Sequence, residues 1–321
     1  GQDIKISDER FEYGRNFANK IWNASRFVMM NLEGVDNNSI DFDKLTIADK
    51  WILDKLNNTA KEVNSNIENY RIGETAHILY DFFWNSYCDW YVEIAKVQLQ
   101  DEALKLNTQR VLRYVLDMSL RLLHPIMPHI TEQVWQLIPK QTEFKAIMLA
   151  DYPVYEEKLA FPTEAREMEL VFETIKSLRN VRQSFNIPMG LNFNIEIQAA
   201  ADEKPVFEAI ESYIRRMAKV ENISYAEVSA PVAKKSATAV VSASKIVIPL
   251  ENLIDFNAEI ARQEKKLGKL QTERKSLEGR VNNPKFAANA PAELIKQTKD
   301  RIEEILVQEN AINELVESLK S

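Results

Sequence analysis

Two blocks of a seven-residue hydrophobic repeat follow Leu253, and they restrict the fold of the chain more than any other feature. The spacings within each block fit the a and d positions of a coiled coil. The repeat positions are Phe256, Ile260, Leu267, Leu270, Leu277 and Val281, then Ile295, Ile302, Ile305, Ile312, Val316 and Leu319. Asn282, Asn283, Pro284 and Pro291 lie between the blocks and interrupt any single helix. Residues 253–321 are therefore predicted to form an antiparallel coiled-coil hairpin, with arms about 40 Å long at the rise of an α-helix.

The first part of the chain has the pattern of long helices with brief breaks. Glycine is scarce, at 7 of 321 residues, which also favours a mainly α protein. Gly34 follows the first helix, Asp43 is the candidate N-cap of the second, and Gly73 separates the second from the third. The predicted helices span residues 8–32, 43–70, 73–100, 105–124 and 128–138. We expect residues 1–150 to form an antiparallel helical bundle.

Residues 151–252 have a mixed pattern. A proline-containing loop precedes a predicted helix over 163–185, and a second helix is predicted over 202–219. Short β-type runs are predicted at 191–198, 223–228, 238–241 and 246–250. This region should form a connecting helix and a small α+β subdomain.

Composition limits the class of protein. Cys88 is the sole cysteine, so an internal disulfide and a cysteine zinc site are both excluded, which suits a reducing cytoplasm. The chain has no apolar run near the ~18 residues of a membrane span. The net charge of −7 argues against indiscriminate nucleic-acid binding, since that affinity comes from Lys and Arg at phosphates. We expect a monomer with no membrane contact, and any RNA binding must use local basic surfaces.

Motifs for an independent catalytic site are missing. The sequence has no phosphate-binding or dinucleotide glycine loop, no His-Glu-x-x-His and no Gly-x-Ser-x-Gly. His124 and His129 flank two prolines, but their spacing does not suit a helical ligand pair, so a helix-breaking corner is favoured over a metal site. The aromatic run from Tyr80 to Tyr91 could stack on bases, although its helical spacing favours core packing.

One face of the first predicted helix suggests RNA contact. No acid occurs between Arg15 and Arg26. Asparagine is a poor helix former, so its repetition there indicates a hydrogen-bonding role. Arginine can bind phosphate and asparagine can bind a base edge, a mixture that suits a folded single-stranded RNA loop. The polar residues Arg15, Asn16, Asn19, Asn23 and Arg26 lie opposite the apolar residues Phe17, Ile21, Ala24 and Val28. A face packed against another domain is the alternative.

Two further basic segments are candidates. Lys176, Arg179 and Arg182 could bind phosphate, although a solvated surface helix is slightly favoured. The first helix and tip of the predicted hairpin carry Arg262, Lys265, Lys266, Lys269, Arg274, Lys275, Arg280 and Lys285. Such charges often serve pairing between coiled-coil helices, but their excess near the turn favours phosphate contact modestly.

Several stretches resemble the valyl-tRNA synthetase family, in its bacterial form. They are GQDI (1–4), RNFANKIWNA (15–24), RFV (26–28), CDWYVE (88–93), LHP (123–125), PHITE (128–132) with Trp135, RNVR (179–182), NIP (186–188) and, in the hairpin, Leu277, NPKF (283–286) and AP (290–291). The resemblance covers essentially the whole chain. Related synthetases for isoleucine and leucine share some stretches, whereas the hairpin turn is particular to the valyl enzymes.

The resemblance implies a tRNA-binding role. The bundle would be the anticodon-binding domain of a class I synthetase and would hold the anticodon stem-loop of valine tRNA, while the hairpin would contact the outer corner of that tRNA. The implied anticodon contacts are Arg15, Asn16, Asn19, Lys20, Asn23, Arg26, Arg179 and Arg182. The family's ATP- and magnesium-dependent catalytic domain and its editing domain are not represented here. We therefore expect no cofactor and no aminoacylation from this chain alone. The alternative is a structural module whose bundle presents a coiled coil to a protein.

Overall fold

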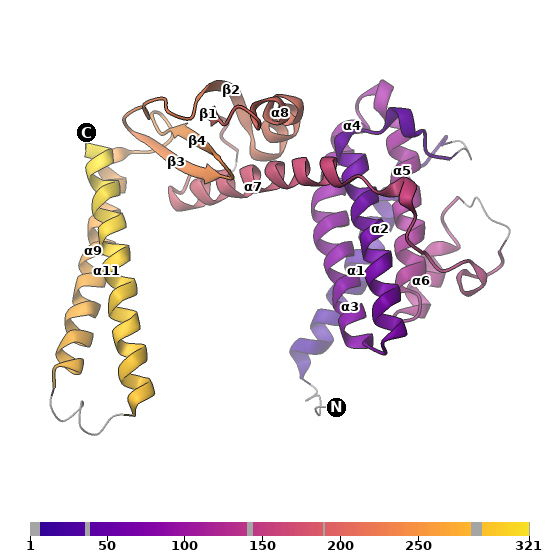
Figure 1. Ribbon diagram of the computed structural model, residues 1–321, viewed down its shortest axis with the longest axis horizontal. Helices are drawn as coiled ribbons and strands as arrows, with labels where there is room; N and C mark the ends of the chain where they lie inside the picture. The colour runs from indigo at the N-terminus through magenta and orange to yellow at the C-terminus, as the bar shows by residue number, and fades with distance from the viewer. Residues whose placement is uncertain (1–6, 36–38, 140–143, 189, 284–290, 321) are drawn as a thin grey trace. The chain divides into compact units, whose positions relative to one another are not determined.

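A computed structural model describes residues 7–35, 39–139, 144–188, 190–283 and 291–320 (Figure 1). The chain divides into two compact units, residues 1–169 and 170–321. Both units agree with the predicted fold class, because long helices dominate and a small sheet occurs only in the second. The predicted domain limits at residues 150 and 252 stay predictions.

The first unit is the predicted antiparallel bundle, in which successive long helices lie side by side (Figure 1). Its long elements are α1 (Asp8–Asn31), α2 (Ile47–Glu68), α3 (Ile72–Asp81), the π-helix η2 (Phe82–Tyr91), α4 (Val92–Gln98), α5 (Glu102–Leu123) and α6 (Pro128–Trp135). Short 3-10 helices occur at η1 (Phe42–Lys44), η3 (Ile147–Leu149) and η4 (Glu157–Leu159). Among the described residues, no helix is both long and apolar enough to cross a membrane.

Large aromatic side chains fill the core of the bundle. Phe83, Tyr87, Tyr91 and Trp135 are each at most 1% exposed. The tyrosine hydroxyls are satisfied inside, since Tyr91 donates to Asp49 Oδ1 at 2.7 Å and Tyr87 donates to a backbone carbonyl at 3.0 Å. The prediction that the aromatic run packs in the core is confirmed for Phe83, Tyr87 and Tyr91.

The start of α2 differs from the prediction that Asp43 caps it. Asp43 lies in η1, and α2 begins four residues later at Ile47. Thr46 and Asp49 form a reciprocal capping box there, at 3.1 and 2.9 Å. That pair satisfies two backbone N–H groups at once, which a lone aspartate does not.

The break between α2 and α3 also differs from the prediction, because Gly73 lies inside the first turn of α3. The chain reverses at Tyr70, whose φ of 58° is left-handed. The Arg71 amide donates to the Asn66 carbonyl at 2.8 Å and the Tyr70 amide donates to Ile67 at 3.0 Å. These bonds make a Schellman motif with tyrosine where glycine is usual.

The second unit contains the predicted α+β subdomain. Helix α7 (Pro162–Ser184) enters it, and the subdomain follows as β1 (Phe193–Ala199), α8 (Lys204–Ala218), β2 (Val220–Glu227), β3 (Ser236–Val241) and β4 (Ser244–Pro249). The strand order is β2-β1-β4-β3, with β1 and β2 parallel and the other pairs antiparallel. The sheet thus has β2 and β3 as its edges.

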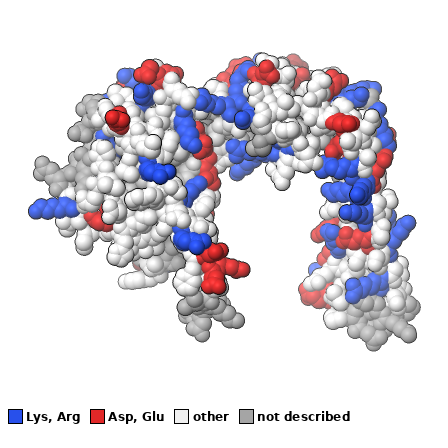
Figure 2. Space-filling view, turned by 180° about the vertical axis from the view of Figure 1, so that it is seen from behind, with Lys and Arg blue, Asp and Glu red and all other residues white. Residues whose placement is uncertain are grey.

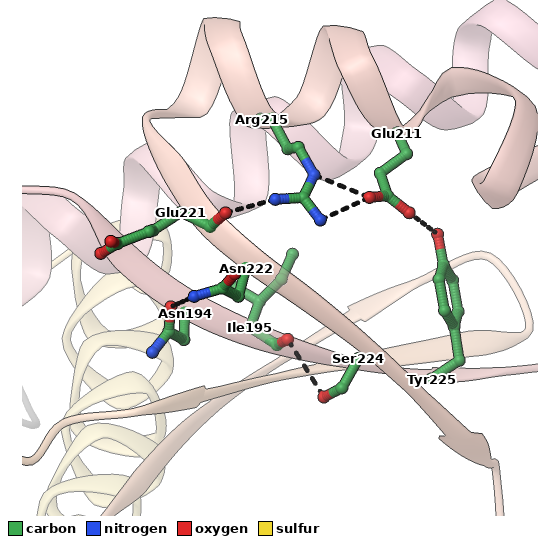
Figure 3. Close-up of polar contacts among 8 residues, drawn as sticks. All are labelled: Asn194, Ile195, Glu211, Arg215, Glu221, Asn222, Ser224 and Tyr225. Carbon is green, nitrogen blue, oxygen red and sulfur yellow. Dashed lines mark hydrogen bonds and ion pairs between the residues drawn. The ribbon is translucent and has the colours of Figure 1, made fainter.

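A polar network joins α8 to β2 (Figure 3). Glu211 accepts from Arg215 at 2.7 Å and from the Tyr225 hydroxyl at 3.2 Å. Arg215 also donates to the backbone carbonyl of Glu221. Arg215 is therefore committed to holding the helix on the strand.

The arm, α9 (Phe256–Val281) with α11 (Ala292–Lys320), confirms the predicted hairpin. Four repeat positions form its buried core, namely Leu270, Ile305, Ile312 and Val316, with Ile260, Leu267 and Leu277 packed against them. Ion pairs across the arm set its register, with Lys320 to Glu264 at 3.0 Å and Arg274 to Glu309 at 2.9 Å.

Candidate nucleic-acid interface

The two faces of α1 lie as the sequence pattern predicts. Its apolar residues Phe17, Ile21, Ala24 and Val28 are at most 9% exposed. Its polar residues Arg15, Asn16, Asn19, Asn23 and Arg26 are all exposed. Arg15 makes one ion pair, with Glu12 at 3.4 Å, and a pair this exposed holds its side chain weakly. The Arg/Asn face, defined as these five polar residues, is thus available for a ligand.

Lys20 differs from its neighbours on α1. Its Nζ lies 2.6 Å from Asp89 and 5.0 Å from the centre of the Trp84 ring, on the π-helix η2. The lysine is half-buried in this arrangement. A side chain held by a carboxylate and an aromatic ring is better placed to join α1 to η2 than to bind phosphate.

Sequence reasoning missed the exposed aromatic side chains of α1, among them Trp22 and Tyr13. Trp22 is 42% exposed and is three residues from Asn19 and four from Arg26, so it shares their side of the helix. Tyr13 is 52% exposed and stacks on Tyr80 at 4.6 Å between ring centroids. Exposed rings beside Arg and Asn can stack on unpaired bases. The sequence did contain a signal for Trp22, because helical spacing places it beside the polar residues of the Arg/Asn face.

His124 lies at the corner that the sequence predicts. Its Nδ1 is 2.8 Å from the Thr131 hydroxyl, which donates to the Met127 carbonyl. These contacts join the end of α5 to the start of α6. Within the described part of the chain, no group of three His, Cys, Asp or Glu side chains is arranged to hold a metal.

Arg182 on α7 must be withdrawn as a phosphate contact. Its side chain is buried, and its guanidinium donates to the carbonyls of Pro188 at 2.6 Å, Leu191 at 2.9 Å and Ala218 at 3.2 Å. It also stacks over Phe193 at 4.7 Å, and burial lowers its pKa. A guanidinium committed to three backbone carbonyls has little capacity left for RNA. Lys176 and Arg179 are exposed on the same helix.

Replacing Arg182 with alanine should destabilise the second unit by about 2–4 kcal/mol, because three backbone carbonyls lose a charged donor that is itself buried. Hydrogen–deuterium exchange along α8 and residues 188–191 would measure the loss. Arg179→Ala on the exposed face of α7 is the matched control and should cost less than about 1 kcal/mol. Equal protection of these amides from exchange in the two variants would contradict the structural role of Arg182.

Two arginines of the arm are bound within the protein. Arg262 pairs with Glu259 at 2.6 Å and also donates to the Ser184 carbonyl. Arg274 pairs with Glu278 at 2.7 Å as well as with Glu309. The hydrogen bonds that Arg262 donates to Glu259 and Arg274 donates to Glu309 are the main cause that raises the pKa of each arginine. The Arg274–Glu309 pair joins α9 to α11, as the coiled-coil pairing alternative predicted, whereas Arg262 joins α9 to the end of α7.

The other predicted basic residues of the arm are exposed where the structure describes them. Figure 2 shows Lys and Arg side chains gathered on the half of the arm next to the sheet. The exposed residues are Lys265, Lys266, Lys269, Lys275 and Arg280. Lys285 lies outside the described residues. This set forms the exposed basic surface of the arm.

Comparison with known families matches two parts of the chain. A model described as the anticodon-binding domain of tRNA ligase matches residues 49–198. A model described as the valyl tRNA synthetase tRNA binding arm matches residues 255–320. The first match begins after α1, so it does not include the Arg/Asn face. The second match coincides with the hairpin.

Curated relatives align over the whole chain. The valine–tRNA ligase of Listeria monocytogenes is 41% identical, and the chain spans 36% of its length. The valine–tRNA ligases of Enterococcus faecalis and Bacillus subtilis are 39% and 38% identical, with 37% and 36% of their lengths covered. All three alignments include 100% of this chain. The chain therefore spans little more than a third of these relatives, at their C-terminal part.

Proposed function

Because this chain belongs to the valyl-tRNA synthetase family, we propose that it is the tRNA-binding part of a valine–tRNA ligase. The bundle binds the anticodon stem-loop of valine tRNA, and the arm binds the outer corner of the same tRNA. The observation that carries this proposal is the match of two different tRNA-binding family models to two different parts of one chain, residues 49–198 and 255–320.

The Arg/Asn face of α1 is our proposed anticodon-binding surface. It is exposed over three turns and contains no acid, and Trp22 adds a ring on which a base can stack. Arginine supplies bidentate phosphate contacts and asparagine reads base edges. The opposite face is packed into the bundle, so RNA contacts here would not compete with folding.

The exposed basic surface of the arm is our proposed contact with the tRNA corner. Its lysines stand on a helix of 26 residues, which reaches about 40 Å from base to tip. Phosphate contacts of this kind orient an RNA without reading its sequence. The arm would thus strengthen binding without choosing the anticodon.

The remaining proposals concern the whole enzyme. A valine–tRNA ligase joins valine to its tRNA with ATP and magnesium, which we assign to a catalytic domain that this chain does not match. Holding the tRNA at two distant places would position its acceptor end for that domain, so binding energy contributes to the reaction through orientation. We propose that the protein acts as a monomer in the cytoplasm.

Replacing Arg15 and Arg26 together with alanine should weaken binding of valine tRNA about tenfold or more, since both charges lie on the proposed anticodon surface. Fluorescence anisotropy would compare valine tRNA with a tRNA of changed anticodon. The unmodified chain should prefer the first, and the double variant should lose most of that preference.

The matched control for these arginines is Arg166→Ala, an exposed position on α7 in the same unit. It should leave affinity and preference unchanged. All five tryptophans belong to the first unit, so their fluorescence reports whether each variant keeps its bundle. Equal affinity of the unmodified chain for the two tRNAs would sink the anticodon assignment. A loss of bundle stability without a change in binding would support the packing alternative.

A further inference from the structure

An open groove of about 710 Å³ lies in the second unit, between the end of α7, the edge strand β3 and α11. It is separate from the Arg/Asn face, and its lining residues do not include the predicted basic residues of the arm. The residues that matter here are Lys234, Lys235, Lys245, Ser236, Thr238 and Glu314.

The charges and hydrogen-bonding groups of the groove suit an anionic ligand. Among the described residues that line the groove, three are lysines and one, Glu314, is acidic. Ser236 and Thr238 add hydroxyl groups on the edge strand. Lysine ammonium groups together with hydroxyls are the usual protein contacts to phosphate oxygens. In a chain with a net charge of −7, three lysines in one groove make a local positive site at which an anion can bind.

The local backbone holds two of these lysines, Lys235 and Lys245, in position. Lys245 lies in β4, paired with Val240 of β3 on one side and Gln198 of β1 on the other. Lys235 has a left-handed φ of 56°, its carbonyl accepts from Leu250 at 2.9 Å, and its Nζ lies 5.3 Å from the centre of the Phe256 ring. Lys235 thus ties the groove to the first residue of the arm.

The groove extends along the base of the arm. Ala311, Glu314 and Leu315 of α11 form one wall of it. Their neighbours Ile312 and Val316 share a core cluster with Leu270 of α9, so this wall is level with that part of α9. Lys266 and Lys269 are exposed within a turn of Leu270. The wall of the groove on α11 and the exposed lysines Lys266 and Lys269 of α9 therefore lie at the same level along the arm, within one unit.

We propose that this groove is a third RNA-binding surface, which holds the sugar–phosphate backbone of the tRNA where that RNA leaves the arm. The inference rests on the proposed tRNA-binding function and extends it to residues of the α+β subdomain. Because the contacts are to phosphate, the groove contributes affinity for any tRNA and no anticodon preference. A peptide lying along β3 is the competing occupant, but the excess of lysines favours a polyanion.

The double substitution Lys234→Gln/Lys245→Gln tests the groove. Lys235 is left intact because its ring contact supports the fold. The variant has two fewer charges to neutralise phosphates, so its affinity for valine tRNA should fall about tenfold at physiological salt. The plot of log K against log salt should become less steep, with the magnitude of its negative slope smaller by about 2. The variant should keep the ratio of affinities between valine tRNA and the anticodon-changed tRNA.

The matched control is Lys204→Gln/Lys219→Gln, two exposed lysines of the same unit that do not line the groove. It should leave affinity and salt slope unchanged. Lys234→Arg/Lys245→Arg should bind as the unmodified chain does, since charge is retained. If the Gln double variant binds valine tRNA as tightly as the unmodified chain does, the proposed role of the groove is overturned while the proposed function stands. Failure of the unmodified chain to bind valine tRNA overturns both.

A second measurement does not depend on affinity. Burial raises the pKa of the sole cysteine, Cys88, to about 12, so it reacts slowly with a maleimide. Thr238→Cys would place one reactive thiol in the groove. Valine tRNA should slow its labelling severalfold, whereas an unchanged rate at saturating RNA would overturn the proposal.

Discussion

Trp135→Ala is expected to lower the free energy of unfolding of the helical bundle by about 3–5 kcal/mol, the cost of removing a large aromatic side chain from a packed core. Trp135 is 1% exposed at the end of α6. Its Nε1 donates to Asp117 Oδ1 at 2.5 Å, and the same carboxylate pairs with Arg121 at 2.7 Å. The substitution therefore leaves a cavity and also removes one of the two donors that satisfy Asp117.

The measurement is urea unfolding followed by tryptophan fluorescence, which reports the first unit alone because the second has no tryptophan. Trp22→Ala is the matched control, since Trp22 is 42% exposed and should cost less than about 1 kcal/mol. Trp135→Phe should cost less than Trp135→Ala, because it keeps a six-membered ring in the core and loses only the five-membered ring of the indole with its N–H donor. Similar midpoints for the two alanine variants would contradict the assignment of Trp135 to the core.

Periodicity was sufficient to predict the helices and the hairpin, because each buries a stripe of side chains that recurs at a fixed spacing. The heptad spacing by itself assigns Leu270, Ile305 and Ile312 to the arm core, where all three lie. The residues at which helices begin and end were harder to predict. Asp43 and Gly73 have the residue types of a cap and a break. Thr46 takes the role of the cap through its reciprocal hydrogen bonds with Asp49, and Tyr70 takes the role of the break through backbone hydrogen bonds. Residue type alone does not decide which of several neighbours makes such bonds.

The exposure of a candidate site residue could be predicted from the sequence only where its own helix determines that exposure. Arg15 and Arg26 are exposed because they lie opposite the apolar stripe of α1, which the sequence displays directly. Arg182 is a basic residue on a basic helix segment, but the loop after α7 and the end of α8 close around it. Lys20 likewise donates a hydrogen bond to Asp89, which is 69 residues away in the chain. Contacts at such separations come from the tertiary fold and leave no local signal.

The groove had no signature in the sequence for a similar reason. Lys234, Lys235 and Lys245 belong to two segments that meet only when β3 pairs with β4, and Glu314 comes from α11, much further along the chain. Taken separately, each lysine is an ordinary surface residue. Only the folded sheet brings them together against one acid, which makes charge density a property of the second unit as a whole.

Ile305→Asp is expected to open the arm and to reduce tRNA affinity at least about tenfold without changing anticodon preference. Ile305 is fully buried in the core cluster with Leu270, Ile312 and Val316. An unpaired carboxylate there costs about 3–5 kcal/mol, and the cluster is small, so α11 should separate from α9. The exposed lysines on α9 and the wall of the groove on α11 then no longer have fixed positions, and neither helix can hold phosphates in register with the other.

Val307→Asp is the matched control, because Val307 is two residues away on the same helix and 70% exposed. It introduces the same charge near the RNA, so any effect of added negative charge appears in both variants and only the difference reports the arm's packing. Fluorescence anisotropy with valine tRNA and the anticodon-changed tRNA measures that difference, while tryptophan fluorescence should show an unaltered bundle in each variant. If Ile305→Asp and Val307→Asp bind tRNA equally, an ordered hairpin is not what contributes the affinity, and the arm acts only through its charge.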